Sequence, residues 1–330
     1  MILKNLLWMF LLAGFVGCAT IDHDDDPPTI TTDTPTSEAL ELAVKYGGPQ
    51  LAQFKKLIKK RNAKKEVNRL LTQKILEGKM DESQTWRAVR LYQASSSLYI
   101  SPKVVSKLIS SDKLFHRQLG WLLAAHRPSD LVAAVLERYM TRALVDGDEE
   151  ELYLPELALA VKANRIRSVY SILRQGLMAK GGAEFVEAMT SFEPEKSVDH
   201  LMDYLALANI EDLRQMNQKT VDLKTCMAIL RHFSEFRVPI SHPRFEHLFF
   251  YVVSRNASLS DLARIALQKY MPKDRDQLAY TLSRLPVWIQ VAFVEGTREQ
   301  MNANIGLFLS ELKGVTSHRE VVEEINALRR

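Results

Sequence analysis

The chain has 330 residues, of which 46% are apolar and 25% charged, and its formal net charge is +4. These proportions are those of a globular protein, and the length allows a large core, in one elongated domain or in two. The sequence contains no nucleic-acid recognition motif, so we expect no nucleic-acid partner.

The first 17 residues have the three parts of a secretory leader. Lys4 supplies a positive charge, Leu6 to Val16 form an apolar stretch, and small residues follow. The stretch is shorter than the roughly 20 apolar residues that a membrane-spanning helix needs. The sequence therefore predicts a signal peptide over residues 1–17.

The quartet "FVGC", residues 15–18, resembles the lipobox of bacterial lipoproteins, although Phe15 stands where leucine is usual. The resemblance implies that Cys18 is diacylated on sulfur, becomes the first residue of the mature protein and is then acylated on its amine. Several acyl chains make a stable anchor, whereas a single chain is marginal. Ordinary cleavage after Ala19 and a retained anchor are the two alternatives.

The residue after Cys18 bears on the location. In the lipoproteins that this segment resembles, Asp at the next position favours retention in the inner membrane, and here that residue is Ala19. The resemblance therefore implies a lipid-anchored protein on the periplasmic face of the outer membrane.

Residues 18–36 are rich in Asp, Thr and Pro and offer little to bury, so we expect them to stay unfolded as an acidic tether. They contain five Asp and no Lys or Arg, which leaves residues 37–330 with a net charge of +8. We interpret the cluster from Asp22 to Asp26 as a solvated acidic run rather than a cation site.

A cluster of positive charge follows the tether in "FKKLIKKRNAKK". Leu51, Phe54, Leu57 and Ile58 predict the apolar stripe of an amphipathic helix, opposite the cations. Two interpretations are open for the cations: a solvated helix face, or contact with anionic lipid or an acidic protein. The seven cations are Lys55, Lys56, Lys59, Lys60, Arg61, Lys64 and Lys65.

Residues 37–330 show helical spacing of apolar residues almost throughout. In "PSDLVAAVLERYMTRAL" the apolar residues from Leu131 to Leu144 form one broad stripe, and Ser129 or Asp130 offers an N-cap. Prolines after the tether fall at the edges of such stretches, as the cost of an interior proline requires. We predict an all-α domain over residues 37–330, with about 14 or 15 helices of about 8 to 17 residues.

Short helices joined by short turns pack as antiparallel neighbours, and a long series stacks into an α-solenoid. The helix rhythm resembles HEAT or TPR architecture, and residues 111–144 form the clearest helix pair. The apolar segment 245–253 predicts a central, covered helix. An irregular helical bundle is the second interpretation.

Candidate chemical groups are few. Cys226 lies on a helical apolar face and predicts a buried, inert thiol. His242 and His247 are five apart, which is poor spacing for a shared metal on a helix. Ser-x-x-Lys matches begin at Ser110 and Ser310 without the partner motifs of penicillin-binding enzymes. We expect no catalytic residue, metal or cofactor.

One enzyme family needs separate comparison. "DESQTW", with Glu82 and Ser83, and "GLMAK", from Gly176, resemble motifs of lytic transglycosylases, but they lie far apart and Ala179 replaces the expected Gln. Glu82 is more simply a first-turn acid of a helix.

Size, lipobox and helical character together resemble the accessory lipoproteins around the outer-membrane core of type IVB secretion machines. The resemblance implies a non-enzymatic scaffold or docking component whose partners are other envelope proteins. The alternative is a peptidoglycan-linked lipoprotein, either a murein-cleaving enzyme or a regulator of one.

Overall fold

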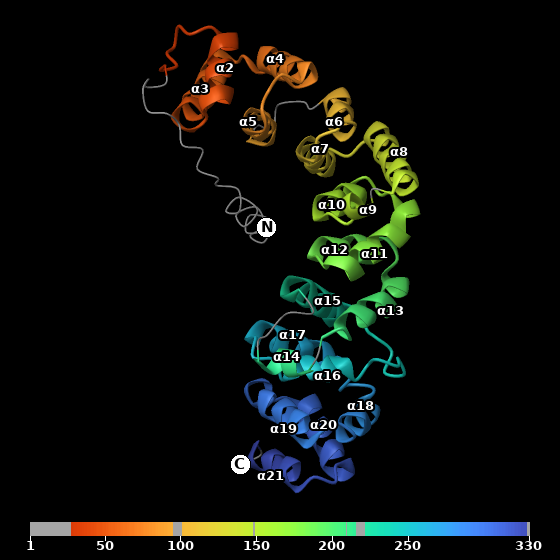
Figure 1. Ribbon diagram of the computed structural model, residues 1–330. Coiled ribbons are helices and arrows are strands. Elements are labelled where there is room, and N and C mark those ends of the chain that lie inside the picture. Colours follow the sequence, from red (N-terminus) through yellow and green to blue (C-terminus); the bar gives the residue numbers. More distant parts are fainter. Residues whose placement is uncertain (1–27, 95–100, 148, 209, 216–221, 329–330) are drawn as a thin grey trace. The chain divides into compact units, whose positions relative to one another are not determined.

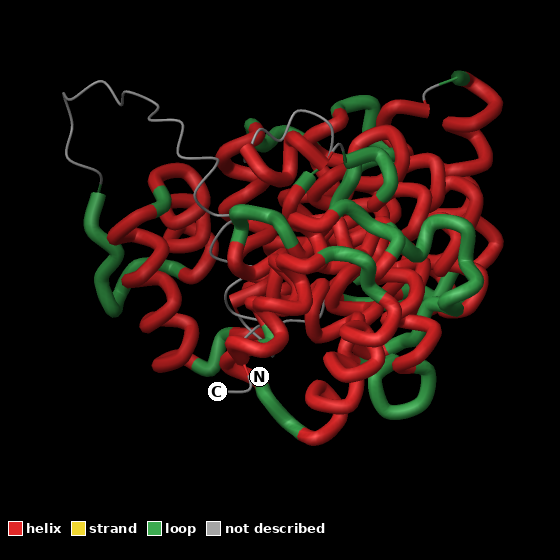
Figure 2. Tube along the Cα trace, turned by 90° about the horizontal axis from the view of Figure 1, so that it is seen from below, coloured by secondary structure: helices red, strands yellow, loops and turns green. Residues whose placement is uncertain are grey.

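The computed structural model describes residues 28–94, 101–147, 149–208, 210–215 and 222–328. Every regular element within these ranges is a helix, as the colours of Figure 2 show. The all-α prediction is therefore confirmed. The described residues form two compact units, one built from 28–74 and 83–94 and the other from 75–82 and 101–328.

The first unit consists of four helices, except that the last three residues of α4 and the first residue of α5 belong to the second unit. α2 packs against α3, and each helix buries an apolar stripe in which Leu40 and Phe54 are fully enclosed. A salt bridge of 2.8 Å between Lys74 and Glu41 joins α4 to α2. The four helices are α2 (Thr36–Tyr46), α3 (Gly48–Arg61), α4 (Lys64–Glu77) and α5 (Glu82–Ala94).

The segment before α2 is tied to α3, although we expected it to belong to an unfolded tether. Ile30 is buried, and its N–H donates to Gln53 Oε1 at 3.0 Å. Arg61 donates to the carbonyl oxygens of Thr32 and Thr34. An apolar side chain and a guanidinium with several donors therefore give this Thr-rich segment contacts that its composition alone does not predict.

The second unit contains a continuous row of helices, each packed against the next, which can be followed in Figure 1. This row consists of α7 (Leu114–His126), α10 (Pro155–Ala163), α12 (Ala183–Phe192), α15 (Leu223–Glu235) and α17 (Ala257–Gln268).

A second layer accompanies this row. α6, α11, α13 and α16 pack against the row, and the layer's helices pack against one another in the pairs α6–α8, α11–α13 and α13–α16. Helix pairs stacked in this way make the unit α-solenoid-like, as predicted. The layer consists of α6 (Pro102–Ile109), α8 (Asp130–Asp146), α11 (Tyr170–Lys180), α13 (Pro194–Leu205) and α16 (His247–Val252).

The C-terminal helices continue the stacking, with α16 against α19, α18 against α20, and α19 against α21. Two short connecting elements, η1 and η2, are 3₁₀ turns. These remaining elements are α9 (Glu149–Leu152), η1 (Arg167–Val169), α14 (Ile210–Gln215), α18 (Arg275–Ser283), α19 (Val287–Gly296), η2 (Arg298–Gln300), α20 (Ala303–Val315) and α21 (Arg319–Leu328).

A chain of aromatic rings forms the core where α16, α19 and α20 meet. Phe245 lies edge-on to Tyr270 and Phe249, with centroids 5.1 Å and 6.2 Å apart. Phe293 continues the chain, with Phe249 and Phe308 each at 5.6 Å. Edge-to-face contacts of this kind stabilise a core beyond the area that they bury.

The prediction of helix lengths is wrong for several elements. α9 has four residues, and α14 and α16 have six each. The apolar segment 245–253 is largely buried as predicted, but its helix begins only at His247. The reason is a turn in which the N–H of Arg244 donates to His242 Nδ1 at 3.1 Å.

Two packing predictions also need correction. The two helices predicted to pair over residues 111–144 are not each other's main neighbours. α7 packs mainly against α6 and α10, while α8 packs against α6 and α9. Leu131 and Leu144, which we placed on the buried stripe of α8, are 56% and 42% exposed. Two predicted features of helix ends are confirmed: Ser129 caps α8, and no proline in the described ranges lies inside a helix beyond its first turn.

Candidate functional site

Two predicted features, Cys18 and the acidic run from Asp22 to Asp26, lie outside the described residues. Their roles stay predictions. The predicted cations after the tether all lie within the described residues, so their surroundings can be examined directly.

The seven cations occupy the end of α3 and the start of α4 rather than one helix. α3 ends at Arg61, and Asn62 closes it in the left-handed conformation with φ 51°. Asn adopts this conformation more readily than most residues, so the chain turns here and α4 begins at Lys64. We call the seven residues the basic cluster: Lys55, Lys56, Lys59, Lys60, Arg61, Lys64 and Lys65.

All residues of the basic cluster are exposed. The apolar stripe of α3 faces the other way, and Phe54 and Leu57 are 0% and 6% exposed where α3 packs on α2. The predicted apolar stripe is confirmed for Phe54 and Leu57, which belong to the core of the first unit, whereas Leu51 and Ile58 are only half-buried.

No acid among the described residues forms an ion pair with a lysine of the basic cluster. α3 contains no Asp or Glu, and no ion pair among the described residues includes a lysine of the cluster. Lys55 and Lys59 are four residues apart, as are Lys56 and Lys60, and such like-charge pairs each cost a helix about 0.2–0.5 kcal/mol. Lys59, Lys60 and Arg61 lie in the last turn of α3, where the helix dipole favours cations. The dipole gives no such support to Lys64 and Lys65 at the start of α4, so helix stability explains only part of the cluster.

The cluster accounts for the charge asymmetry of the chain. Residues 37–94 contain 13 Lys and Arg against six Asp and Glu, whereas residues 95–330 contain 30 against 29. The positive excess after the tether is thus concentrated in the helices that follow it most closely, where it creates a local positive potential.

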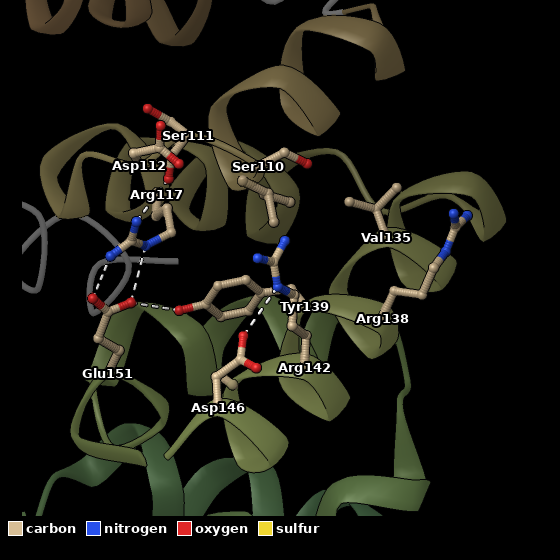
Figure 3. Close-up of a pocket in the computed structure, with 12 residues that line it drawn as sticks. Ser110, Ser111, Asp112, Arg117, Val135, Arg138, Tyr139, Arg142, Asp146 and Glu151 are labelled. Carbon is tan, nitrogen blue, oxygen red and sulfur yellow. Dashed lines mark hydrogen bonds and ion pairs between the residues drawn. The ribbon is translucent and has the colours of Figure 1, made fainter. Parts of the chain in front are cut away.

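A second candidate site is a cavity of about 680 Å³ in the second unit, between the turn after α6 and the length of α8 (Figure 3). Its volume is in the range of small-molecule sites. The sequence did not single it out, because its residues come from separate helices with no shared motif. The lining includes Ser110, Ser111, Asp112, Arg117, Arg138, Tyr139, Arg142, Asp146 and Glu151.

A network of charged groups closes one side of this cavity (Figure 3). Arg117 Nε donates to Glu151 Oε2 at 2.9 Å, and the Tyr139 hydroxyl donates to the same oxygen at 2.6 Å. Arg117 also donates to the carbonyl oxygen of Ser111 at 2.7 Å. Burial and the bond to Glu151 raise the pKa of Tyr139. The network joins α7, α8 and α9. The charges of Arg117 and Glu151 are paired with each other.

Arg138 and Arg142, one turn apart on α8, also line the cavity, and Figure 3 shows Arg142 beside the Tyr139 ring and Arg138 farther from the network. Arg142 pairs with Asp146 at 3.1 Å in an exposed position. Together with Arg117, Asp112 and Glu151, the lining therefore balances three cations with three carboxylates. It offers donors and acceptors with no net charge, so it selects no ligand by charge.

Ser111 connects the turn at this cavity to α7. Its Oγ lies 3.2 Å from His116 Nδ1 and accepts the N–H of Lys113 at 3.3 Å. His116 Nε2 is buried without a hydrogen-bond partner among the described residues, and burial lowers the pKa of His116. No carboxylate among the described residues is hydrogen-bonded to this imidazole, so the contact is explained as a helix-start interaction. Ser110, where the Ser-x-x-Lys match begins, is the C-cap of α6.

The structure places Cys226 as predicted. Its side chain is fully buried in α15, and Sγ lies 3.5 Å from the Tyr251 hydroxyl. Burial raises the pKa of the thiol to about 12. A thiol that stays protonated and enclosed is a poor nucleophile and metal ligand.

His242 and His247 have separate structural roles. His242 accepts the N–H of Arg244 at Nδ1, and its Nε2 lies 3.1 Å from Asp199. His247 packs against Phe250, with ring centroids 5.1 Å apart, and burial lowers its pKa. Within the described part of the chain, no three His, Cys, Asp or Glu side chains are grouped to hold a metal ion.

The two segments that resemble transglycosylase motifs differ in burial: one is at an exposed helix start and the other is on a buried helix face. Glu82 is the first residue of α5 and is exposed, and the carbonyl oxygen of Ser83 accepts from Arg87 Nε at 3.1 Å. Gly176 lies in the buried part of α11, where the ring of Phe185 fills the space beside it.

No family model, no curated protein and no solved structure matches this chain. None of the described helices combines the length and the apolar character that crossing a bilayer requires. The candidate site therefore has to be judged on its own chemistry, which favours the basic cluster over the charge-balanced cavity.

Proposed function

We propose that this chain is a lipoprotein of the outer membrane, anchored on the periplasmic face through Cys18, and that its helical body is a non-enzymatic docking component of an envelope assembly. The observation that carries the proposal is the continuous row of α7, α10, α12, α15 and α17, in which each helix packs against the next. Stacked helix pairs present side chains from many helices on one extended surface, and such surfaces commonly bind protein partners.

The anchor is supported by the resemblance of "FVGC" to a lipobox. An envelope assembly such as the outer-membrane core of a type IVB secretion machine is the setting that this combination of lipobox, size and helical body resembles. Its partners would be other envelope proteins.

The proposal is tested by replacing the anchor residue. Cys18→Ser should leave the far-UV circular dichroism of the body unchanged, move the protein out of the membrane fraction and abolish co-purification with its partners. Cys226→Ser is the matched control, because its thiol is enclosed in α15, and this variant should remain in the membrane fraction. Mass spectrometry of protein from its native host that finds an unmodified Cys18 in the mature chain would contradict the anchor.

A separate experiment tests the non-enzymatic part. The body is incubated with purified sacculi, and released muropeptides are measured. We expect none above a boiled control. Release that disappears in Glu82→Gln would assign a murein-cleaving activity instead.

A further inference from the structure

We propose that the basic cluster of α3 and α4 is a contact surface for a bilayer that carries anionic lipid headgroups. The inference rests on the proposed function in one respect, since acylation of Cys18 would bring the cluster close to a membrane. The charge and exposure of the cluster do not depend on that anchor.

Chain length limits how far the basic cluster lies from an acylated Cys18. Ile30 is buried and its N–H is bonded to Gln53 of α3, so the chain is tied to α3 from this residue on. Only 12 peptide units separate Cys18 from Ile30. Fully extended, they span about 40 Å at most. An anionic bilayer attracts cations within about one Debye length, roughly 8–10 Å. A reach of about 40 Å therefore lets the cluster touch the surface but does not hold it there, so the charge of the cluster itself has to supply the contact.

The type of cation favours lipid over an acidic protein. Six of the seven residues are Lys, and the one Arg, Arg61, is occupied by the carbonyl oxygens of Thr32 and Thr34. Arg is the residue suited to bidentate recognition of a defined carboxylate, whereas Lys is a mobile point charge. Six lysines that form no ion pair with any acid in the described ranges therefore match the diffuse array of phosphates on a membrane surface.

The geometry of α3 also defines how the contact works. Phe54 and Leu57 are buried in the first unit, so the apolar side of α3 is not available for insertion between acyl chains. The contact is therefore electrostatic and peripheral. It should weaken strongly as salt is added, because exposed charges are screened.

The test uses residues 19–330, which include every described residue but lack Cys18. Sedimentation measures partitioning onto vesicles of phosphatidylglycerol and phosphatidylethanolamine, and onto neutral phosphatidylcholine vesicles, at low and high salt. We expect binding to the anionic vesicles only, and its loss at high salt. The triple variant Lys56→Gln, Lys60→Gln, Lys64→Gln should lower the partition coefficient about tenfold or more, since each Lys near an anionic surface contributes separately.

The control variant carries the same change of charge elsewhere: Lys103→Gln, Lys107→Gln, Lys180→Gln, all exposed residues of the second unit. It should bind the anionic vesicles like the unaltered protein. Thermal unfolding of both triple variants checks that the folds are equally stable. Absence of binding to anionic vesicles, or equal loss in both variants, would overturn the proposal.

A parallel binding experiment with poly-glutamate distinguishes an anionic bilayer from an acidic protein as the partner. If poly-glutamate binds the protein more tightly than vesicles of the same total charge, and the Lys56, Lys60 and Lys64 variant abolishes this, the partner is an acidic protein and the lipid proposal is wrong. Because Cys18 is absent throughout, failure here leaves the anchor untouched, and failure of the anchor leaves this result untouched.

Discussion

The Tyr139 hydroxyl donates a hydrogen bond to the Glu151 carboxylate at 2.6 Å, while Arg117 holds the same carboxylate from α7. One acid of the short helix α9 thus joins three consecutive helices. The side chains of Arg117 and Glu151 are only 13% and 23% exposed, so solvent screens the pair weakly.

Removing this carboxylate should destabilise the second unit. Glu151→Ala leaves the Arg117 guanidinium without its counter-charge in a mostly enclosed position, and we expect the free energy of unfolding to fall by about 2–3 kcal/mol. Urea titration followed by circular dichroism measures the change. Arg142→Ala is the control, because its pair with Asp146 is exposed and should contribute under about 0.5 kcal/mol. Equal effects of the two substitutions would contradict the assigned role of Glu151.

Two glycines inside helices should respond in opposite directions to alanine. A Cβ at Gly176 would meet the buried ring of Phe185, with Cζ at 2.8 Å, whereas nothing lies within 4 Å of the same position at Gly306. Gly176→Ala should therefore destabilise the protein by about 1–3 kcal/mol through overpacking. Gly306→Ala should stabilise it by about 0.5–1 kcal/mol through helix propensity. Thermal unfolding of the two variants gives the signs, and a gain at Gly176 would show that α11 and α12 are packed differently.

The sequence was sufficient for features that depend on local pattern. Apolar spacing and proline position predict the helices and most of their ends, as Ser129 at α8 illustrates, and the apolar face around Cys226 predicts its burial. The buried stripe of α3 was predicted for the same reason.

The packing partners of each helix could not be predicted from local sequence pattern. The apolar surface of α7 is broad, with Leu119, Trp121 and Leu123 all buried, so it does not indicate whether α6, α8 or α10 is the neighbour. The contact between Arg117 and Glu151 joins residues that are 34 positions apart. No local motif marks either relationship, and none marks the division into two units.

Arg165 follows α10 in the left-handed conformation, with φ 56°. The N–H of Ile166 donates to Val161 O at 3.2 Å, the pattern of a helix C-terminus that usually has glycine at this position. Arg165→Gly should therefore raise the free energy of unfolding by about 0.5–1 kcal/mol. Arg167→Gly is the control, since Arg167 lies in η1 without a positive φ, and it should give no gain. Equal responses to both substitutions would mean that Arg165 is not strained.

The free energy of unfolding should also fall in alkaline solution, because a cysteine thiol and two tyrosine hydroxyls are buried in their protonated forms. Burial raises the pKa of the Cys226 thiol to about 12 and that of the Tyr270 hydroxyl to about 12, while the Tyr251 pKa is raised as well. In the unfolded chain these groups ionise at about 8.5 for Cys and about 10 for Tyr. A pKa raised by folding contributes stability that is fully present below the unfolded pKa and is lost as pH rises toward the folded value.

We therefore expect a constant free energy of unfolding from neutral pH to about pH 8 and a steady fall above it, with Cys226 alone accounting for about 2 kcal/mol at pH 10. Urea titrations at successive pH values measure the curve. Cys226→Ala should be less stable at neutral pH, because it leaves a small cavity, but its stability should fall less steeply between pH 8 and pH 10. If the stability of Cys226→Ala falls as steeply as that of the unaltered protein between pH 8 and pH 10, the Cys226 thiol does not cause the loss of stability. The loss would then come from the buried tyrosines.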